Sequence, residues 1–142
     1  MSETFIIEGS NGKASVTFRD SAMGTRTQGI ESFVLTLTTE ELQIKRRVNL
    51  CAAYEVHGLA DFFSGLAQGG KAVVSERLWE TIEGDLKLTC KCDRQTRVLM
   101  TFELRSVSFP AGYPSWTLKL TIALGAGQMA SLESGIKEFC RL

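Results

Sequence analysis

The sequence predicts an α+β fold built on a largely antiparallel β-sheet, because strand-like segments dominate the chain and follow one another directly. About seven segments alternate apolar and polar residues with a period of two, which is typical of strands with one buried face. Two segments instead repeat apolar residues at helical spacing, one between the strand groups and one at the C-terminal end. Consecutive strands, rather than strands alternating with helices, favour antiparallel pairing.

The clearest local pattern is a hairpin between residues 86 and 104, onto which we expect the other elements to pack. Two alternating runs flank the polar stretch 93–96, and such matched runs across a short polar break predict a hairpin. The acidic segment 78–85 leads into it, and residues 71–77 before that segment are expected to be coil. The inward positions of the hairpin are Leu86, Leu88, Cys90, Cys92, Val98, Met100, Phe102 and Leu104.

The N-terminal half carries four further strand-like segments in two pairs. The first pair, 4–8 and 14–19, is separated by an Asn-Gly dipeptide, which favours a tight hairpin turn. The second pair, 30–39 and 42–51, is rich in β-branched and aromatic residues, which favour strands over helices. The polar and glycine-containing residues 20–29 between the pairs are expected to form a loop.

Two amphipathic helices complete the expected fold. The first covers residues 58–68 and ends at two glycines, and the second begins at Met129 and runs to the end of the chain. A proline-containing loop at 106–115 and a long strand at 116–124 lie between the hairpin and the second helix. The apolar faces consist of Leu59, Phe62, Phe63 and Leu66 in the first helix and Met129, Leu132, Ile136 and Phe139 in the second.

Length and charge restrict the classes of function. A chain of 142 residues is expected to form a single globular domain, residues 1–142. Its 16 basic residues balance its 16 acidic ones, whereas a nucleic-acid-binding protein usually carries a basic excess, so we expect no nucleic-acid partner. No apolar run approaches the roughly 20 residues of a membrane span, and no secretory signal is present, so a cytoplasmic location without membrane contact is expected.

The four cysteines predict no metal site and no disulfide. Without an export signal they are expected to be reduced thiols in or near the core. Cys90 and Cys92 are separated by one residue, whereas common zinc motifs place two or more residues between neighbouring ligands. The remaining cysteines, Cys51 and Cys140, are far away in the chain. We therefore expect neither metal nor cofactor.

From Tyr54 onward the order of short motifs and expected elements resembles that of the WapI-type immunity proteins and their small bacterial relatives. The matching segments are 58–62 (GLADF) with Leu66-Ala67, 79–86 (WETIEGDL), Trp116 in the last strand and the amphipathic C-terminal helix. The resemblance covers about the last 90 residues. For the immunity members of the family, it implies binding and neutralisation of a partner toxin.

Five polar residues are candidates for a functional site. Glu80, Glu83 and Asp85 lie within six residues, and carboxylates at this density can perform acid–base chemistry or hold a hard cation. His57 is the only histidine, and Asp61 follows it by one helical turn. The alternative interpretation is structural: solvated carboxylates near a turn, and a surface histidine.

Arg46 conflicts with the pattern of its strand, because alternation places its charge on an otherwise apolar face. Gly84 permits a bulge before the hairpin that would turn Glu83 inward, while alternation places Asp85 outward. We therefore expect Glu83 to be buried and to pair with Arg46.

Aromatic residues supply the other candidate contacts. Trp79 and Trp116 occupy positions that favour the core, whereas Phe109 and Tyr113 lie on the proline-containing loop, where aromatic side chains often anchor interfaces.

Together these features favour a non-enzymatic binding protein whose partner is a protein. The contact surface is expected at the loops 20–29 and 106–115 or at the acidic stretch 80–85, and self-association through an open sheet edge is a further expectation. The alternative is a small-ligand-binding or metal-dependent enzyme site built from His57, Asp61, Glu80, Glu83 and Asp85, which would require a pocket where these side chains converge.

Overall fold

The α+β prediction is confirmed by the computed structural model, which describes residues 4–23, 29–68, 76–92, 97–108 and 113–142. These residues form eight strands in two four-stranded antiparallel sheets, together with two α-helices. The elements are β1 (Thr4–Glu8), β2 (Ser15–Met23), β3 (Ile30–Thr38), β4 (Gln43–Asn49), α1 (Ala53–Gln68), β5 (Arg77–Glu80), β6 (Leu86–Cys92), β7 (Val98–Ser108), β8 (Tyr113–Leu124), a 3₁₀ turn (Ala126–Gln128) and α2 (Met129–Cys140).

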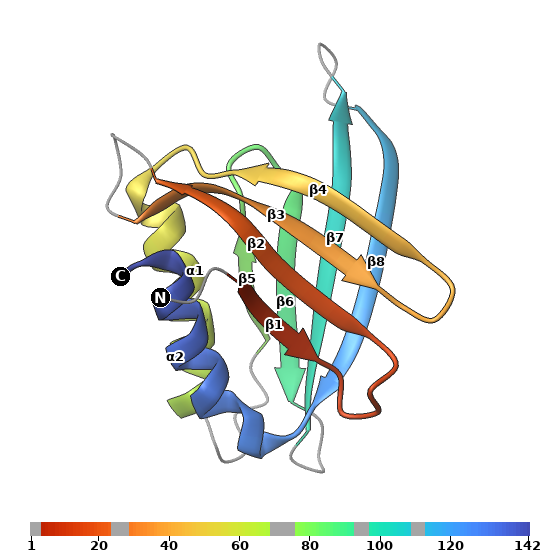
Figure 1. Cartoon of the computed structure of the whole chain (residues 1–142), viewed down its shortest axis with the longest axis vertical. Coiled ribbons are helices and arrows are strands. Elements are labelled where there is room, and N and C mark those ends of the chain that lie inside the picture. The colour runs from red at the N-terminus through yellow and green to blue at the C-terminus, as the bar shows by residue number, and fades with distance from the viewer. Residues whose placement is uncertain (1–3, 24–28, 69–75, 93–96, 109–112) are drawn as a thin grey trace.

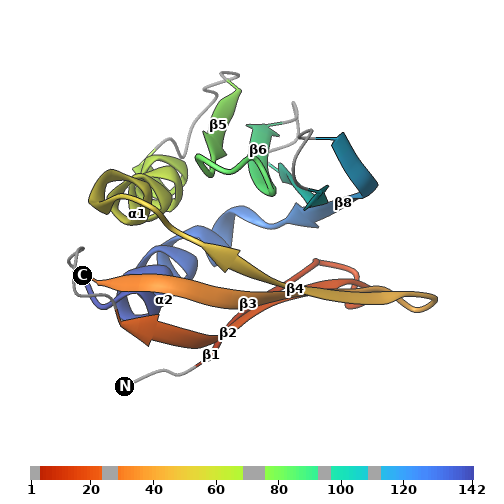
Figure 2. The same ribbon diagram turned by 90° about the horizontal axis from the view of Figure 1, so that it is seen from above.

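The two sheets lie face to face, and the helices cover one side of the space between them (Figures 1 and 2). Strands β1 to β4 form the first sheet in chain order, and β5 to β8 form the second, so every hydrogen-bonded pair joins consecutive strands. Helix α1 connects the sheets, and α2 follows the last strand. Because each strand pairs with the next one along the chain, the order of the alternating segments was sufficient to predict antiparallel pairing.

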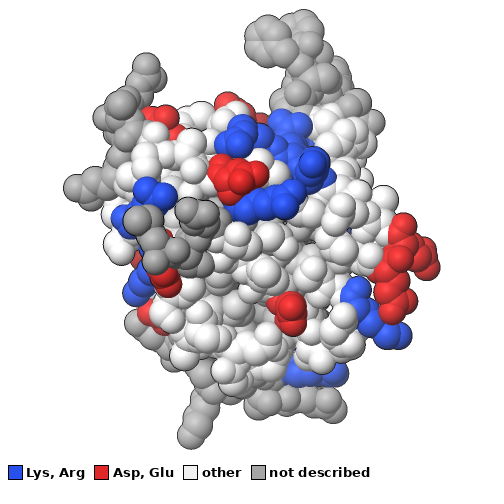
Figure 3. All heavy atoms as spheres, in the orientation of Figure 1, with Lys and Arg blue, Asp and Glu red and all other residues white. Residues whose placement is uncertain are grey.

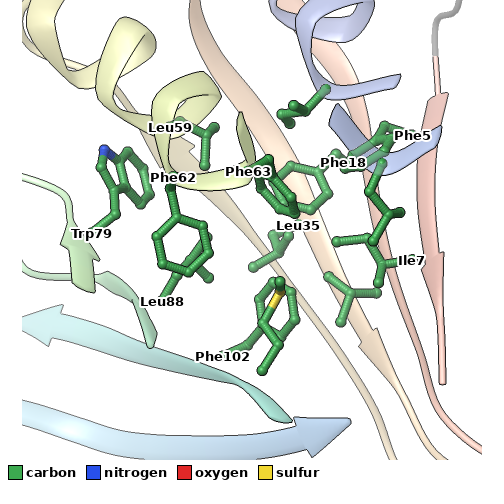
Figure 4. Close-up of a cluster of buried hydrophobic side chains, with 14 of the residues drawn as sticks. Phe5, Ile7, Phe18, Leu35, Leu59, Phe62, Phe63, Trp79, Leu88 and Phe102 are labelled. Atoms are coloured by element: carbon green, nitrogen blue, oxygen red, sulfur yellow. The ribbon is translucent and has the colours of Figure 1, made fainter. Parts of the chain in front are cut away.

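Aromatic side chains join the helices to the first sheet. Phe5 and Phe18 are 5.4 Å apart between ring centroids, Phe5 reaches Phe63 of α1 at 5.8 Å, and Phe18 reaches Phe139 of α2 at 5.9 Å. Leu88 and Phe102 approach the same cluster from the second sheet (Figure 4). The inward faces of both sheets and the apolar faces of both helices therefore share a core, which supplies the main driving force for folding.

The C-terminal helix occupies the expected position. Its apolar residues Met129, Leu132, Ile136 and Phe139 are all buried, as the helical spacing predicted. Lys137 lies in the last turn, where a positive charge interacts favourably with the helix dipole.

Several boundaries differ from the expected ones. Residues 77–80 form strand β5, although residue 77 was expected to be coil and residues 78–80 an acidic segment before the hairpin. This strand raises the number of strands to eight. Strand β2 continues to Met23 and β7 to Ser108, into segments expected to be loops, while residues 24–28 and 109–112 lie outside the described part. Helix α1 begins at Ala53, five residues before the apolar repeat that predicted it.

Two glycines allow α1 to approach the edge strand β5 closely. A Cβ atom at Gly58 would lie 3.1 Å from Trp79 Nε1, and one at Gly65 would overlap the guanidinium of Arg77. The glycines are seven residues apart, so they lie on the same face of the helix. The four-residue β5 is therefore held between β6 and α1, a position that period-two alternation in so short a segment could not indicate.

Candidate functional site

The candidate site is an exposed surface where the first half of α1 meets β5 and the turn that follows it. Both views place α1 beside β5 (Figures 1 and 2). The surface, named here the α1–β5 surface, consists of Tyr54, His57, Asp61, Leu78, Glu80, Ile82 and Glu83, all of which are exposed. It contains four of the five polar residues singled out from the sequence.

Glu55 fixes the geometry of this surface from beneath, although the sequence did not mark it as important. Its side chain is 1% exposed, and Oε1 accepts hydrogen bonds from the backbone N–H groups of Cys51 and Ala52 ahead of α1. Its Oε2 accepts another from Ile82 N–H at 2.9 Å. One carboxylate thus caps the start of α1 and also binds the turn after β5. A hydrogen bond from the N-cap backbone N–H to a glutamate in the first turn is a common way to cap a helix.

Asp85 lies below the same turn and is completely buried, which contradicts its expected outward position. Its Oδ1 accepts a hydrogen bond from Thr81 Oγ1 at 2.6 Å, and its Oδ2 lies 3.5 Å from Nε of Arg46 on β4. The expected partner for Arg46, Glu83, is exposed, so that pairing was wrong. Alternation failed at Asp85 because it precedes β6, where a turn with Gly84 at a φ of 74° redirects the chain.

Glu83 instead reaches the thiol of Cys51, whose sulfur lies 3.7 Å from Glu83 Oε1. Cys51 is exposed, whereas the sequence placed it in or near the core with Cys90 and Cys140, both of which are buried. The pKa of the Cys51 thiol is raised, first because neighbouring atoms displace part of the water around the sulfur, and second because of the negative charges of Glu83 and Glu55. A raised pKa keeps the thiol protonated, so this cysteine is poorly suited to act as a nucleophile.

The remaining carboxylates of the surface point to different partners. Glu80 Oε2 lies 3.9 Å from Arg105, which also contacts Glu103 on the outer face of the second sheet at 3.6 Å. His57 and Asp61 are exposed on α1, and together with Tyr54 they form one stripe along the helix. Among the five residues of the enzyme alternative, Asp85 is enclosed with Thr81 and Arg46, Glu80 and Glu83 have separate partners, and His57 and Asp61 are exposed on α1, so the structure shows no pocket in which all five converge.

Metal ligation finds no support among the described residues, since no three His, Cys, Asp or Glu side chains form a group that could hold an ion. In the same part of the chain, no helix has the length and apolar character needed to cross a membrane.

Exposed apolar side chains distinguish the α1–β5 surface from the rest of the described molecule. Tyr54 is 68% exposed, Leu78 62% and Ile82 54%, and these are the three highest values among the large hydrophobic residues of the described chain. Sequence reasoning missed all three: Leu78 and Ile82 are single apolar residues in a short edge strand and a turn, which carry no periodic signal, and Tyr54 lies in the part of α1 that precedes the apolar repeat. All three belong to elements that are linked through Glu55, and exposed apolar side chains on adjoining elements are typical of a contact surface.

The aromatic candidates have different outcomes. Trp79 is buried, as expected, and its Nε1 donates a hydrogen bond to the backbone oxygen of Glu55 at 3.1 Å. Trp116 is partly buried against the core. Phe109 and the side chain of Tyr113 lie outside the described residues, so their expected role at an interface stays a prediction.

Replacement of Glu83 by glutamine should make Cys51 more reactive, because it removes a negative charge beside the sulfur. We expect the rate of alkylation by iodoacetamide near pH 8 to increase several-fold, measured by mass spectrometry of the peptide that contains Cys51. Cys140 is an internal reference, since burial raises its pKa to about 12. Glu80→Gln is the matched control, and an equal increase in that variant would contradict the assignment to Glu83.

A model of a protein family matches residues 7–141, and its description is a family of unknown function, DUF6228. The chain belongs to this family. No curated protein and no solved structure matches it.

Proposed function

We propose that the protein is a non-enzymatic binding protein that recognises a partner protein through the α1–β5 surface. The observation that carries the proposal is that Tyr54, Leu78 and Ile82, the three most exposed large hydrophobic side chains of the described chain, all belong to α1, β5 or the turn after β5, which are joined through the hydrogen bonds of Glu55. Aromatic and aliphatic anchors surrounded by polar residues are the usual composition of a protein interface.

The charges of the surface indicate the chemistry of the partner. Asp61, Glu80 and Glu83 are exposed around the apolar side chains, whereas Asp85 is paired with Arg46 below. Glu80 has Arg105 at 3.9 Å and Lys87 opposite it in the sheet, whereas Asp61 and Glu83 have no cation at ion-pair distance among the described residues, so part of the acidic charge is left unpaired. A partner with basic side chains around an apolar contact would complement this surface.

Neutralisation of a toxin is the specific form of binding that we propose. It rests on the resemblance to WapI-type immunity proteins, whose matching segments 58–62 and 79–86 contribute Asp61, Glu80, Ile82 and Glu83 to the surface. Rigid support favours this role, because Glu55 holds the helix and the turn in a fixed relation and so limits the entropy lost on binding.

Affinity capture with the tagged full chain from its native cells tests the proposal. The parent is compared with Leu78→Ser/Ile82→Ser and with the control Met23→Ser/Leu42→Ser, which removes two exposed apolar side chains elsewhere. We expect a partner that the parent and the control retain and the first variant loses. Its purified form should bind more weakly as the salt concentration rises, and if it is a toxin, the bound protein should inhibit it. A partner retained equally by all three proteins would contradict the proposal.

A further inference from the structure

The outer face of the first sheet presents a second charged surface, opposite the face that packs on the core. Figure 3 shows basic side chains gathered around a small acidic patch on this face, over β4 and the strands beside it. The register identifies the row Arg19, Val34 and Arg47 across β2, β3 and β4, with Thr17, Thr36 and Lys45 in the adjacent row. We call these six residues the basic sheet face.

Two of the three basic side chains of this face, Lys45 and Arg47, are available for a ligand, and Arg19 shares its charge with Asp20. Arg19, Lys45 and Arg47 are exposed, and within the described residues neither Lys45 nor Arg47 has a carboxylate at ion-pair distance. Arg47 is held in place, because its Nη1 donates to Ser32 Oγ at 2.9 Å and to the backbone oxygen of Asp20 at 3.3 Å. A guanidinium positioned in this way is prepared to bind an oxyanion with its remaining N–H groups.

A polar group without a partner lies between these cations. The hydroxyl of Thr36 is buried, the residue being 6% exposed, and it makes no hydrogen bond within the described structure. Alternation with the inward Leu35 and Leu37 places Thr36 on the outer face, with Thr17 and Lys45 as its direct cross-strand neighbours. A buried hydroxyl without a partner is unfavourable, so its position among basic residues points to a ligand oxygen that would complete it.

A cavity beside Arg19 is also lined by Arg141, so a further positive charge lies close to the basic sheet face. The cavity has a volume of about 280 Å³ and is lined by Thr4, Arg19, Asp20, Ser21 and Arg141. The carboxylate of Asp20 lies 3.9 Å from Arg19, and the Asp20 backbone oxygen accepts a hydrogen bond from Arg47, so one negative charge lies among the basic side chains.

We propose that the basic sheet face binds an acidic segment of a protein, with carboxylates contacting Arg19, Lys45 and Arg47 and one of them accepting a hydrogen bond from Thr36. A peptide with a few spaced carboxylates can avoid Asp20, whereas the continuous phosphate chain of a nucleic acid would be repelled by it. This surface is distinct from the α1–β5 surface, so the protein would have two contact regions of opposite charge.

Fluorescence anisotropy with a fluorescein-labelled peptide of alternating glutamate and alanine tests the inference. We expect saturable binding to the parent that weakens about tenfold in Arg19→Gln/Lys45→Gln. The control Lys91→Gln/Lys119→Gln removes two exposed lysines from the second sheet and should bind like the parent. No saturable binding, or an equal loss in the control, would overturn the proposal, as would tighter binding of a labelled single-stranded DNA oligonucleotide.

Thr36→Val separates a binding role from a structural one. Valine retains the shape and removes a hydroxyl that has no partner in the described structure, so the melting temperature should stay the same or rise. The affinity for the peptide should nevertheless fall several-fold. An unchanged affinity would overturn the assignment of the hydroxyl to the ligand.

Discussion

Replacement of Asp85 by alanine is expected to lower the free energy of unfolding by about 3 kcal/mol. The variant leaves the guanidinium of Arg46 between the sheets without its carboxylate and removes the shorter of the two hydrogen bonds that the Thr81 hydroxyl donates, leaving only the Leu86 carbonyl at 3.4 Å. Removal of one partner from a buried pair is costly because the other charge stays desolvated, and the one-quarter exposure of Arg46 places the effect at the lower end of the usual range. Urea denaturation followed by circular dichroism measures the change.

A double-variant cycle with Arg46→Leu tests whether the pair is the cause. The double variant Asp85→Ala/Arg46→Leu should be more stable than the sum of the two single losses predicts, because it contains no unpaired charge. Glu83→Gln is the control for a nearby carboxylate, and it should change the stability by no more than about 0.5 kcal/mol because Glu83 is exposed. A loss below about 1 kcal/mol in Asp85→Ala would show that Arg46 is satisfied by water instead.

Replacement of Phe139 by alanine should cost about 3–5 kcal/mol, since the ring is 1% exposed. The ring contacts Phe18 and Phe33 with centroid distances of 5.9 and 6.1 Å, so its loss leaves a cavity between α2 and the first sheet. The same denaturation measurement applies to this variant.

Lys137→Ala is the matched control on the exposed side of α2. It removes an exposed pair with Glu133 and one charge at the end of the helix dipole, and its effect should stay within about 1 kcal/mol. A Phe139→Ala loss smaller than about 1 kcal/mol would mean that the helix contributes little to the core.

The candidate site could be predicted in part. Charge and spacing identified His57, Asp61, Glu80 and Glu83, and the structure places all four in exposed positions on α1, on β5 or in the turn after β5. The sequence pattern predicted that Glu83 is buried and that Asp85 points outward, whereas the structure shows the reverse. The direction of a side chain near a turn depends on backbone angles that alternation does not describe. Glu55 was missed because one of its three backbone donors, Ile82, lies 27 residues further along the chain.

The sequence by itself determined the α+β class, the hairpins and the buried face of the C-terminal helix, because periods of two and of 3.6 residues record which side of an element avoids water. The tertiary structure alone decided how the strands divide into two sheets and that residues 77–80 join the second, since a short edge strand depends on the pairing and packing that surround it. It also decided that Arg46 meets Asp85 and that Tyr54, Leu78 and Ile82 are exposed on elements joined through Glu55. These relations join distant parts of the chain, and local patterns contain no information about them.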